Sequence, residues 1–109
     1  MKFNVYMCAF MNSEIRIVDV PDSELGETVN EQLGKIFYYG QNDHQVISNR
    51  CSVSAGDVIE YRDSLYLVMG VGFLKISAQE FEKYKALPRN AKFSYYMRVE
   101  NDMDAIRKV

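Results

Sequence analysis

The sequence predicts a single α+β domain over residues 1–109, in which a mostly antiparallel sheet or a partly open small barrel is packed by two helices. Three observations lead to this fold class. β-favouring segments occur in pairs separated by short turns, two segments carry apolar residues at helical spacing, and the connections favour hairpins over parallel crossovers. The predicted order of elements is therefore ββ-α-ββ-α-β.

The first predicted element is a β-hairpin over residues 1–20. KFNVYMCAFM and EIRIVDV are rich in residues that favour strands, and Asn12 and Ser13 between them can form the turn. The first segment is apolar on both faces, which is typical of a covered strand. We therefore expect it in a central position of the sheet.

A helix is predicted over residues 22–39. Apolar residues recur there at spacings of three and four, and these are Leu25, Val29, Leu33, Ile36 and Phe37. Asp22 or Ser23 can accept hydrogen bonds from the first free amides of this helix. Gly40 is expected to end it in the left-handed conformation.

A second β-hairpin is predicted over residues 50–76, with a turn at Gly56-Asp57 before its first strand and a second turn at residues 62–64. Gly70 and Gly72 interrupt its second strand, where missing side chains favour a bulge, a bend or the close approach of another group. We expect the strand to bend there.

The last predicted elements are a helix over residues 78–87, a strand over residues 92–100 and a fraying tail over residues 101–109. Ser77 and Glu80 have the spacing of a capping box, and Pro88 ends the helical pattern. The segment KFSYYMRVE is interpreted as the final strand.

The composition is that of an ordinary globular protein, with 48% hydrophobic and 26% charged residues. The eight tyrosines and six phenylalanines, without tryptophan, indicate surfaces that contact a partner or ligand, because tyrosine joins an apolar ring to a hydroxyl group. The net charge of −2 conceals a local basic stretch between Lys83 and Arg98 that contains no acidic residue.

The sequence predicts neither a structural metal nor a cofactor. Cys8 and Cys51 are the only cysteines and His44 the only histidine, which by themselves do not complete a zinc site. The first residues lack the basic and apolar pattern of a signal peptide, so we do not expect secretion, and no apolar run approaches the length that spans a membrane. We expect a reducing, cytoplasmic location.

No motif for catalysis is present. The sequence lacks a G-x-S-x-G motif, and GVGF lacks the third glycine and the following helix of a dinucleotide fingerprint. A bent strand explains GVGF better. The sequence therefore favours a protein that is not an enzyme.

The loop after the first helix is one candidate site. Its side chains can hydrogen-bond to and stack on a small polar ligand. The candidate ligand-binding residues are Tyr38, Tyr39, Gln41, Asn42, Asp43 and His44. The alternative is an ordinary solvated loop, since Asn-Asp is common turn chemistry.

A second candidate site is KYKALPRNAKFSYYMR, where basic and aromatic side chains interleave. This combination binds phosphates and stacks on bases of single-stranded nucleic acid. The candidate phosphate or nucleic-acid contacts are Lys83, Lys85, Arg89, Lys92, Tyr95, Tyr96 and Arg98. The alternative is a solvated face whose aromatic residues belong to the core.

The stretch NRCSVSAGDVIEYRDSLYLVMGVGFLKI carries a further pattern, an (R)S-x-S-V-x-D-V-I-like run followed by G-F-x-K-I. It resembles a family of small uncharacterised proteins of tailed bacteriophages and mobile elements. The matching positions are Arg50, Ser52, Val53, Ser54, Gly56, Asp57, Val58, Ile59, Tyr66, Val68, Gly72, Phe73, Lys75 and Ile76. IFYYGQNDHQ resembles the tract before that motif, so the likeness spans residues 36–76, with departures at Cys51 and Ala55.

The phage resemblance implies an infected bacterial cytoplasm as the setting. We expect a non-enzymatic accessory protein that binds a host defence or housekeeping protein and inhibits or redirects it. The alternative is a nucleotide-binding or oligonucleotide-binding module, since a Gly-Asp-hydrophobic hairpin also recurs in small barrels resembling the PUA and ASCH group. An enzyme using His44 as general base beside Asp43 is a third hypothesis. An apolar first strand or an exposed sheet edge could pair across a two-fold axis, which favours a homodimer.

Overall fold

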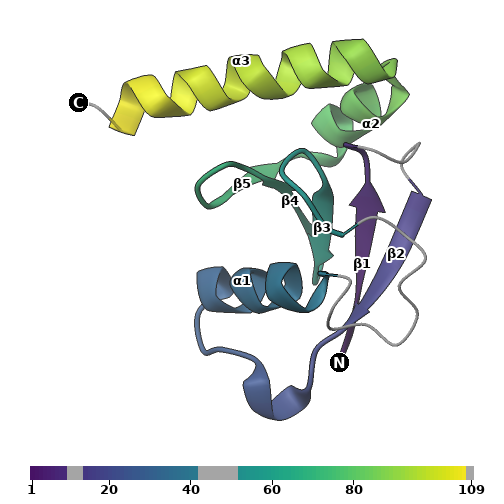
Figure 1. The fold of residues 1–109 in the computed structure, drawn as a ribbon, viewed down its shortest axis with the longest axis vertical. Helices are drawn as coiled ribbons and strands as arrows, with labels where there is room; N and C mark the ends of the chain where they lie inside the picture. The colour runs from purple at the N-terminus through teal and green to yellow at the C-terminus, as the bar shows by residue number, and fades with distance from the viewer. Residues whose placement is uncertain (10–13, 42–51, 108–109) are drawn as a thin grey trace.

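The computed structural model describes residues 1–9, 14–41 and 52–107, without the side chains of Arg89 and of residues 103–107 (Figure 1). It has a five-stranded antiparallel sheet and three α-helices, so the predicted α+β class is confirmed. The sheet is open at both edges and does not close into a barrel.

The strands lie in the order β2-β1-β3-β4-β5, and each neighbouring pair is antiparallel. Their bounds are β1 Lys2–Met7, β2 Glu14–Asp19, β3 Val58–Tyr61, β4 Ser64–Val68 and β5 Phe73–Ile76. β1 lies between β2 and β3, as its apolar sequence predicts. Its central residue Val5 pairs with Arg16 of β2 and with Ile59 of β3.

The helical segments are a short 3-10 turn η1 and three α-helices. Their bounds are η1 Asp22–Glu24, α1 Val29–Tyr39, α2 Ala78–Ala86 and α3 Arg89–Arg107. The predicted helix over residues 22–39 therefore begins later than expected. Thr28 caps α1 by accepting a hydrogen bond from the Glu31 amide at 3.1 Å, and Glu31 in turn accepts from the Glu27 amide at 3.0 Å.

Gly40 ends α1 in the right-handed region, with φ −75°, so the predicted left-handed ending is wrong. A glycine is needed there for a different reason. A methyl group at this position would overlap the Val53 side chain, because the Val53 amide donates to the Gly40 carbonyl at 3.1 Å. This close approach holds the chain that enters β3 against the end of α1.

Gly70 and Gly72 lie in a turn and not in a bent strand. The Met69 amide donates to the Gly72 carbonyl at 3.1 Å, and Gly72 has a φ of 81°, which favours glycine. The predicted second strand is thus divided into β4 and β5. The turn also contacts α3, since the Gly70 amide donates to the Glu100 carboxylate at 3.1 Å.

The predicted final strand over residues 92–100 is wrong, because these residues lie in α3. Pro88 suits the start of a helix, and its carbonyl accepts the Lys92 amide at 2.9 Å. Tyr95, Tyr96 and Val99 then pack against the sheet at helical spacing. α3 continues to Arg107, through most of the tail that was expected to fray.

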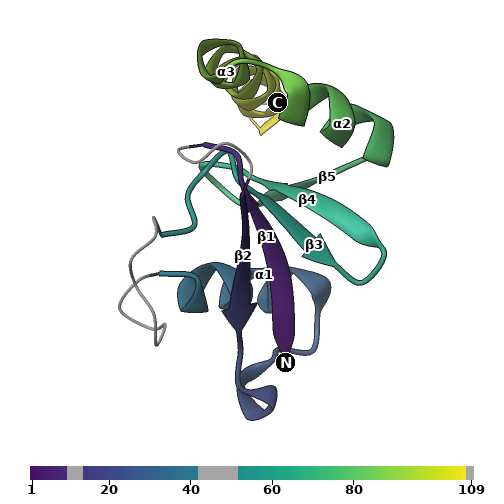
Figure 2. The ribbon, with the colours of Figure 1, turned by 90° about the vertical axis from the view of Figure 1, so that its right-hand side faces the viewer.

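Two hydrophobic cores cover the two faces of the sheet. Figures 1 and 2 show α1 on one face and α2 and α3 on the other. One lies between the sheet and α1, where Leu33 and Ile36 are fully buried. The other lies beneath α2 and α3 and contains Phe81 and Tyr84. Among the helices described, none is long and apolar enough to cross a membrane.

Candidate functional site

A buried carboxyl group organises the chain just before β3. Asp57 is 0% exposed, and its Oδ1 and Oδ2 atoms accept hydrogen bonds from the amides of Ala9 and Ser54, each at 2.8 Å. Its own carbonyl accepts the Val68 amide at 2.8 Å. One side chain therefore fixes the end of β1 and the loop before β3.

Gly56 connects this loop to α2. Its φ of 96° favours glycine, and a methyl group there would lie 3.3 Å from the Ala9 Cβ atom. The buried Tyr84 hydroxyl donates to the Gly56 carbonyl at 2.6 Å. The Gly-Asp pair that the sequence marks as a turn thus joins three segments that are distant along the chain.

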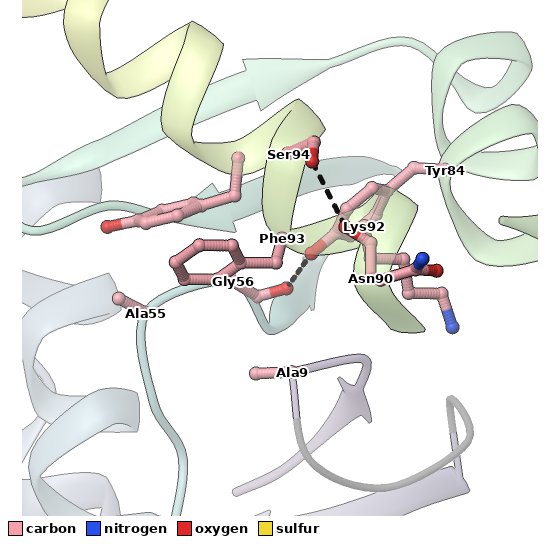
Figure 3. A pocket seen from close by; sticks show the side chains of 9 residues that line it. Ala9, Ala55, Gly56, Tyr84, Asn90, Lys92, Phe93 and Ser94 are labelled. Carbon is pink, nitrogen blue, oxygen red and sulfur yellow. Dashed lines mark hydrogen bonds between the residues drawn. The ribbon is translucent and has the colours of Figure 1, made fainter. Parts of the chain in front are cut away.

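A pocket of about 770 Å³ lies between these loops and the first turns of α3 (Figure 3). Its lining is mostly apolar and comprises Ala9, Ala55, Gly56, Tyr84, Asn90, Lys92, Phe93, Ser94 and Tyr96. The volume falls within the range typical of small-molecule sites.

The helical wall of the pocket carries exposed apolar side chains. Phe93 is 66% exposed and Met97 is 39% exposed, and the two lie one turn apart on α3. Val71, in the turn between β4 and β5, is 68% exposed. Of these residues Phe93 lines the pocket, and an exposed side chain of this size next to a pocket is typical of a binding surface.

Burial raises the pKa values of two side chains beside the pocket, the Asp57 carboxyl and the Tyr84 hydroxyl. It raises the pKa of the Asp57 carboxyl from 3.8 to about 6, although the amides of Ala9, Ser54 and Cys8 act to lower that pKa. Burial also raises the pKa of the Tyr84 hydroxyl, and the nearby Cys8 and Asp57 add to the effect. Tyr84 therefore serves as a neutral hydrogen-bond donor at neutral pH.

The raised pKa of Asp57 predicts that stability falls as pH rises. The folded state holds the Asp57 proton more tightly than the unfolded chain does. The stabilisation that this proton gives is therefore complete below about pH 4 and is lost as the pH rises through about 6. The free energy of unfolding should fall by roughly 3 kcal/mol over this range. Urea unfolding at several pH values, with Asp57→Asn as a reference that lacks the titration, measures the difference. Parallel pH profiles for the two proteins would contradict the prediction.

The predicted loop site is only partly within the described residues. Tyr38 is half exposed, the Tyr39 hydroxyl donates to the Glu24 carboxylate at 2.5 Å, and the Gln41 side chain donates to the Phe37 and Val53 carbonyls. Tyr39 and Gln41 therefore have structural roles at the end of α1. The other predicted contacts, Asn42, Asp43 and His44, lie outside the described residues.

The described residues of the predicted basic and aromatic site are distributed over α2 and α3. Lys83 is exposed, Lys85 pairs with Glu82 at 3.1 Å, and the Arg98 guanidinium lies 5.7 Å from the centre of the Tyr95 ring. Lys92 and Tyr96 line the pocket, whereas the Arg89 side chain lies outside the described part of the chain.

The two predicted surfaces lie on opposite faces of the sheet as far as they are described. Tyr38, Tyr39 and Gln41 belong to the end of α1, and the basic and aromatic residues belong to α2 and α3 (Figure 1). The described residues therefore do not converge on one ligand. Within the same part of the chain, no three His, Cys, Asp or Glu side chains are grouped to hold a metal ion.

Sequence reasoning missed most of the pocket. Ala9, Ala55 and Asn90 carry no chemical signal of their own, and Phe93 was assigned to a strand. Two signals are usable: the Gly56-Asp57 pair, which marks a tight turn, and the basic and aromatic stretch of residues 83–98, which contributes Lys92 and Tyr96 to the lining. Comparison with known proteins adds no relative, since no family model, curated protein or solved structure matches the chain.

Proposed function

We propose that the protein is a phage-encoded, non-enzymatic accessory protein that binds a host bacterial protein in the cytoplasm and inhibits or redirects it. The setting comes from the resemblance of residues 36–76 to small phage proteins. The observation that carries the binding role is Phe93, which is 66% exposed beside the mostly apolar pocket.

The surface next to the pocket has the features of a protein interface. Phe93 and Met97 form an apolar pair one helical turn apart, which is a common arrangement of anchor residues. The pocket beside Phe93 can accept an apolar side chain from the partner. Aromatic residues and methionine are enriched at such interfaces.

The nucleotide or oligonucleotide alternative has less support. Phosphate binding needs several cations on one surface, whereas Lys85 is paired with Glu82 and Arg98 stacks on Tyr95.

We also retain the homodimer as part of the proposal. It rests on Ile17, which is 58% exposed on the edge strand β2.

Site-specific photocrosslinking in bacterial cells tests the proposed function. A benzophenone amino acid at position 93 should give one dominant adduct with a host protein. The matched control places it at Val29, which is also an exposed apolar residue but lies on α1, on the opposite face of the sheet.

The partner identified by mass spectrometry is then purified and mixed with the protein. We expect a stoichiometric complex that Phe93→Ala weakens at least tenfold, as for an interface anchor. The substituted side chain is exposed, so the variant should fold normally. The proposal fails if position 93 gives no adduct, or if positions 93 and 29 give the same adducts.

A further inference from the structure

The edge of the sheet at β2 carries exposed apolar side chains. β2 is the outermost strand on its side of the described sheet, beyond β1 (Figure 1). Ile15 and Ile17 point to the same face of β2, because side chains alternate along a strand, and they are 47% and 58% exposed. The other edge strand, β5, carries the exposed Lys75, a residue type that discourages pairing with another chain. β2 is therefore the edge that favours such pairing.

The backbone of β2 is oriented for pairing at Ile17. The Val20 amide donates to the Met1 carbonyl at 2.8 Å, and the Met1 ammonium donates to the Val20 carbonyl at 2.7 Å. Along an antiparallel pair, residues whose backbone groups face the neighbouring strand alternate with residues whose groups face away from it. In the observed register, the backbone groups of Val18 therefore face β1, and those of Ile17 face the outer edge of the sheet.

A second copy of β2 is complementary to this edge. Two antiparallel copies of one strand are related by a two-fold axis, and an axis at Ile17 places its amide opposite the Ile17 carbonyl of the second copy. The two Ile17 side chains then lie side by side. An axis at Arg16 would instead place two like charges opposite each other, and an axis at Val18 would place Ile17 opposite the Asp19 carboxylate. Ile17 is therefore the favoured centre.

We propose that two copies of this chain pair antiparallel through β2, with Ile17 at the two-fold axis, and join their five-stranded sheets into one. The backbone groups of Ile17 then gain partners, and the exposed isoleucines of both copies are partly buried. This inference rests on the homodimer that the proposed function retains, and it adds the interface. It uses neither the pocket nor the host partner.

Sedimentation equilibrium of the purified chain tests for the dimer. We expect a reversible dimer, which Ile17→Lys weakens by roughly tenfold or more, because the symmetry introduces the lysine twice at the centre of the interface. Val71→Lys is the matched control. Val71 is also an exposed apolar residue, but it lies in the turn between β4 and β5, at the other end of the sheet, so the variant should leave the dimer unchanged.

Disulfide formation tests the register. Ile17→Cys should give a disulfide-linked dimer under mild oxidation, because the Cα atoms of a hydrogen-bonded antiparallel pair lie about 5.5 Å apart, within disulfide range. In the proposed register Ile15 faces Asp19 of the second copy, which places the two Ile15 Cα atoms roughly 14 Å apart. Ile15→Cys should therefore not link the copies. The unsubstituted chain, which contains Cys8 and Cys51, measures the background.

Three results would overturn the proposal. A chain that stays monomeric at low-millimolar concentration removes the homodimer altogether. A dimer that Ile17→Lys and Val71→Lys weaken alike, or that Ile15→Cys links as readily as Ile17→Cys, keeps the homodimer but excludes this interface. A monomer whose benzophenone at position 17 captures a host protein in cells shows that the host protein covers the edge. The photocrosslinking test at position 93 is independent of all three results.

Discussion

Replacing Asp57 with alanine is expected to lower the free energy of unfolding by about 4 kcal/mol at pH 5. The substitution leaves the amides of Ala9 and Ser54 without their acceptor, and a buried donor without a partner costs roughly 1 to 3 kcal/mol. At pH 7 the loss should be about 1 kcal/mol smaller, because the ionised Asp57 carboxylate already destabilises the folded state.

Urea denaturation followed by circular dichroism measures this loss. Asp63→Ala is the matched control, because Asp63 is exposed in the turn between β3 and β4, and it should change stability by no more than about 0.5 kcal/mol. If the loss for Asp57→Ala equals that of the control, the loop before β3 is not held by this carboxyl group.

The parts of the fold that the sequence predicted are those in which local pattern and tertiary packing agree. The stripe containing Leu33 and Ile36 has helical period, and both residues are buried in α1. Glycine at position 40 was also expected at the end of this helix. Its conformation was not predictable, because the close approach of Val53 comes from the far side of a loop.

The final helix was mispredicted because its pattern is ambiguous. Phe93, Tyr95, Met97 and Val99 alternate with other residues, which favours a strand. In the structure Tyr95 and Val99 lie on the side of α3 that packs against the core, whereas Phe93 and Met97 are exposed. The sequence allows both the alternating period of a strand and the period of a helix, and tertiary contacts with the sheet favour the helix.

The candidate site was less predictable than the fold. Ala9, Gly56 and Phe93 are far apart along the chain, and only the packing of α3 over two loops brings them to one pocket. Lys92 and Tyr96 were predicted as contacts for a different reason, as members of a basic stretch. A residue's chemistry can be read from the sequence, but its neighbours depend on the tertiary fold.

Phe81→Ala is expected to lower the free energy of unfolding by about 4 kcal/mol, the usual cost of removing a buried phenylalanine ring. Phe81 is 4% exposed, and its ring lies 4.8 Å from that of Tyr6 in an edge-to-face arrangement. Together with Tyr84 it is one of the two buried residues of α2. Losing its ring weakens the attachment of α2 to the sheet.

This substitution also tests whether α2 supports the pocket. α3 begins at Arg89, directly after α2, and the Tyr84 hydroxyl of α2 holds the Gly56 carbonyl. In hydrogen exchange, Phe81→Ala should therefore deprotect α2 and α3 more than α1. Leu33→Ala, which removes a fully buried side chain from the core beneath α1, should show the reverse order. Equal deprotection in both variants would show that the two cores unfold as one cooperative unit, and that the pocket cannot open by local detachment of α2 and α3.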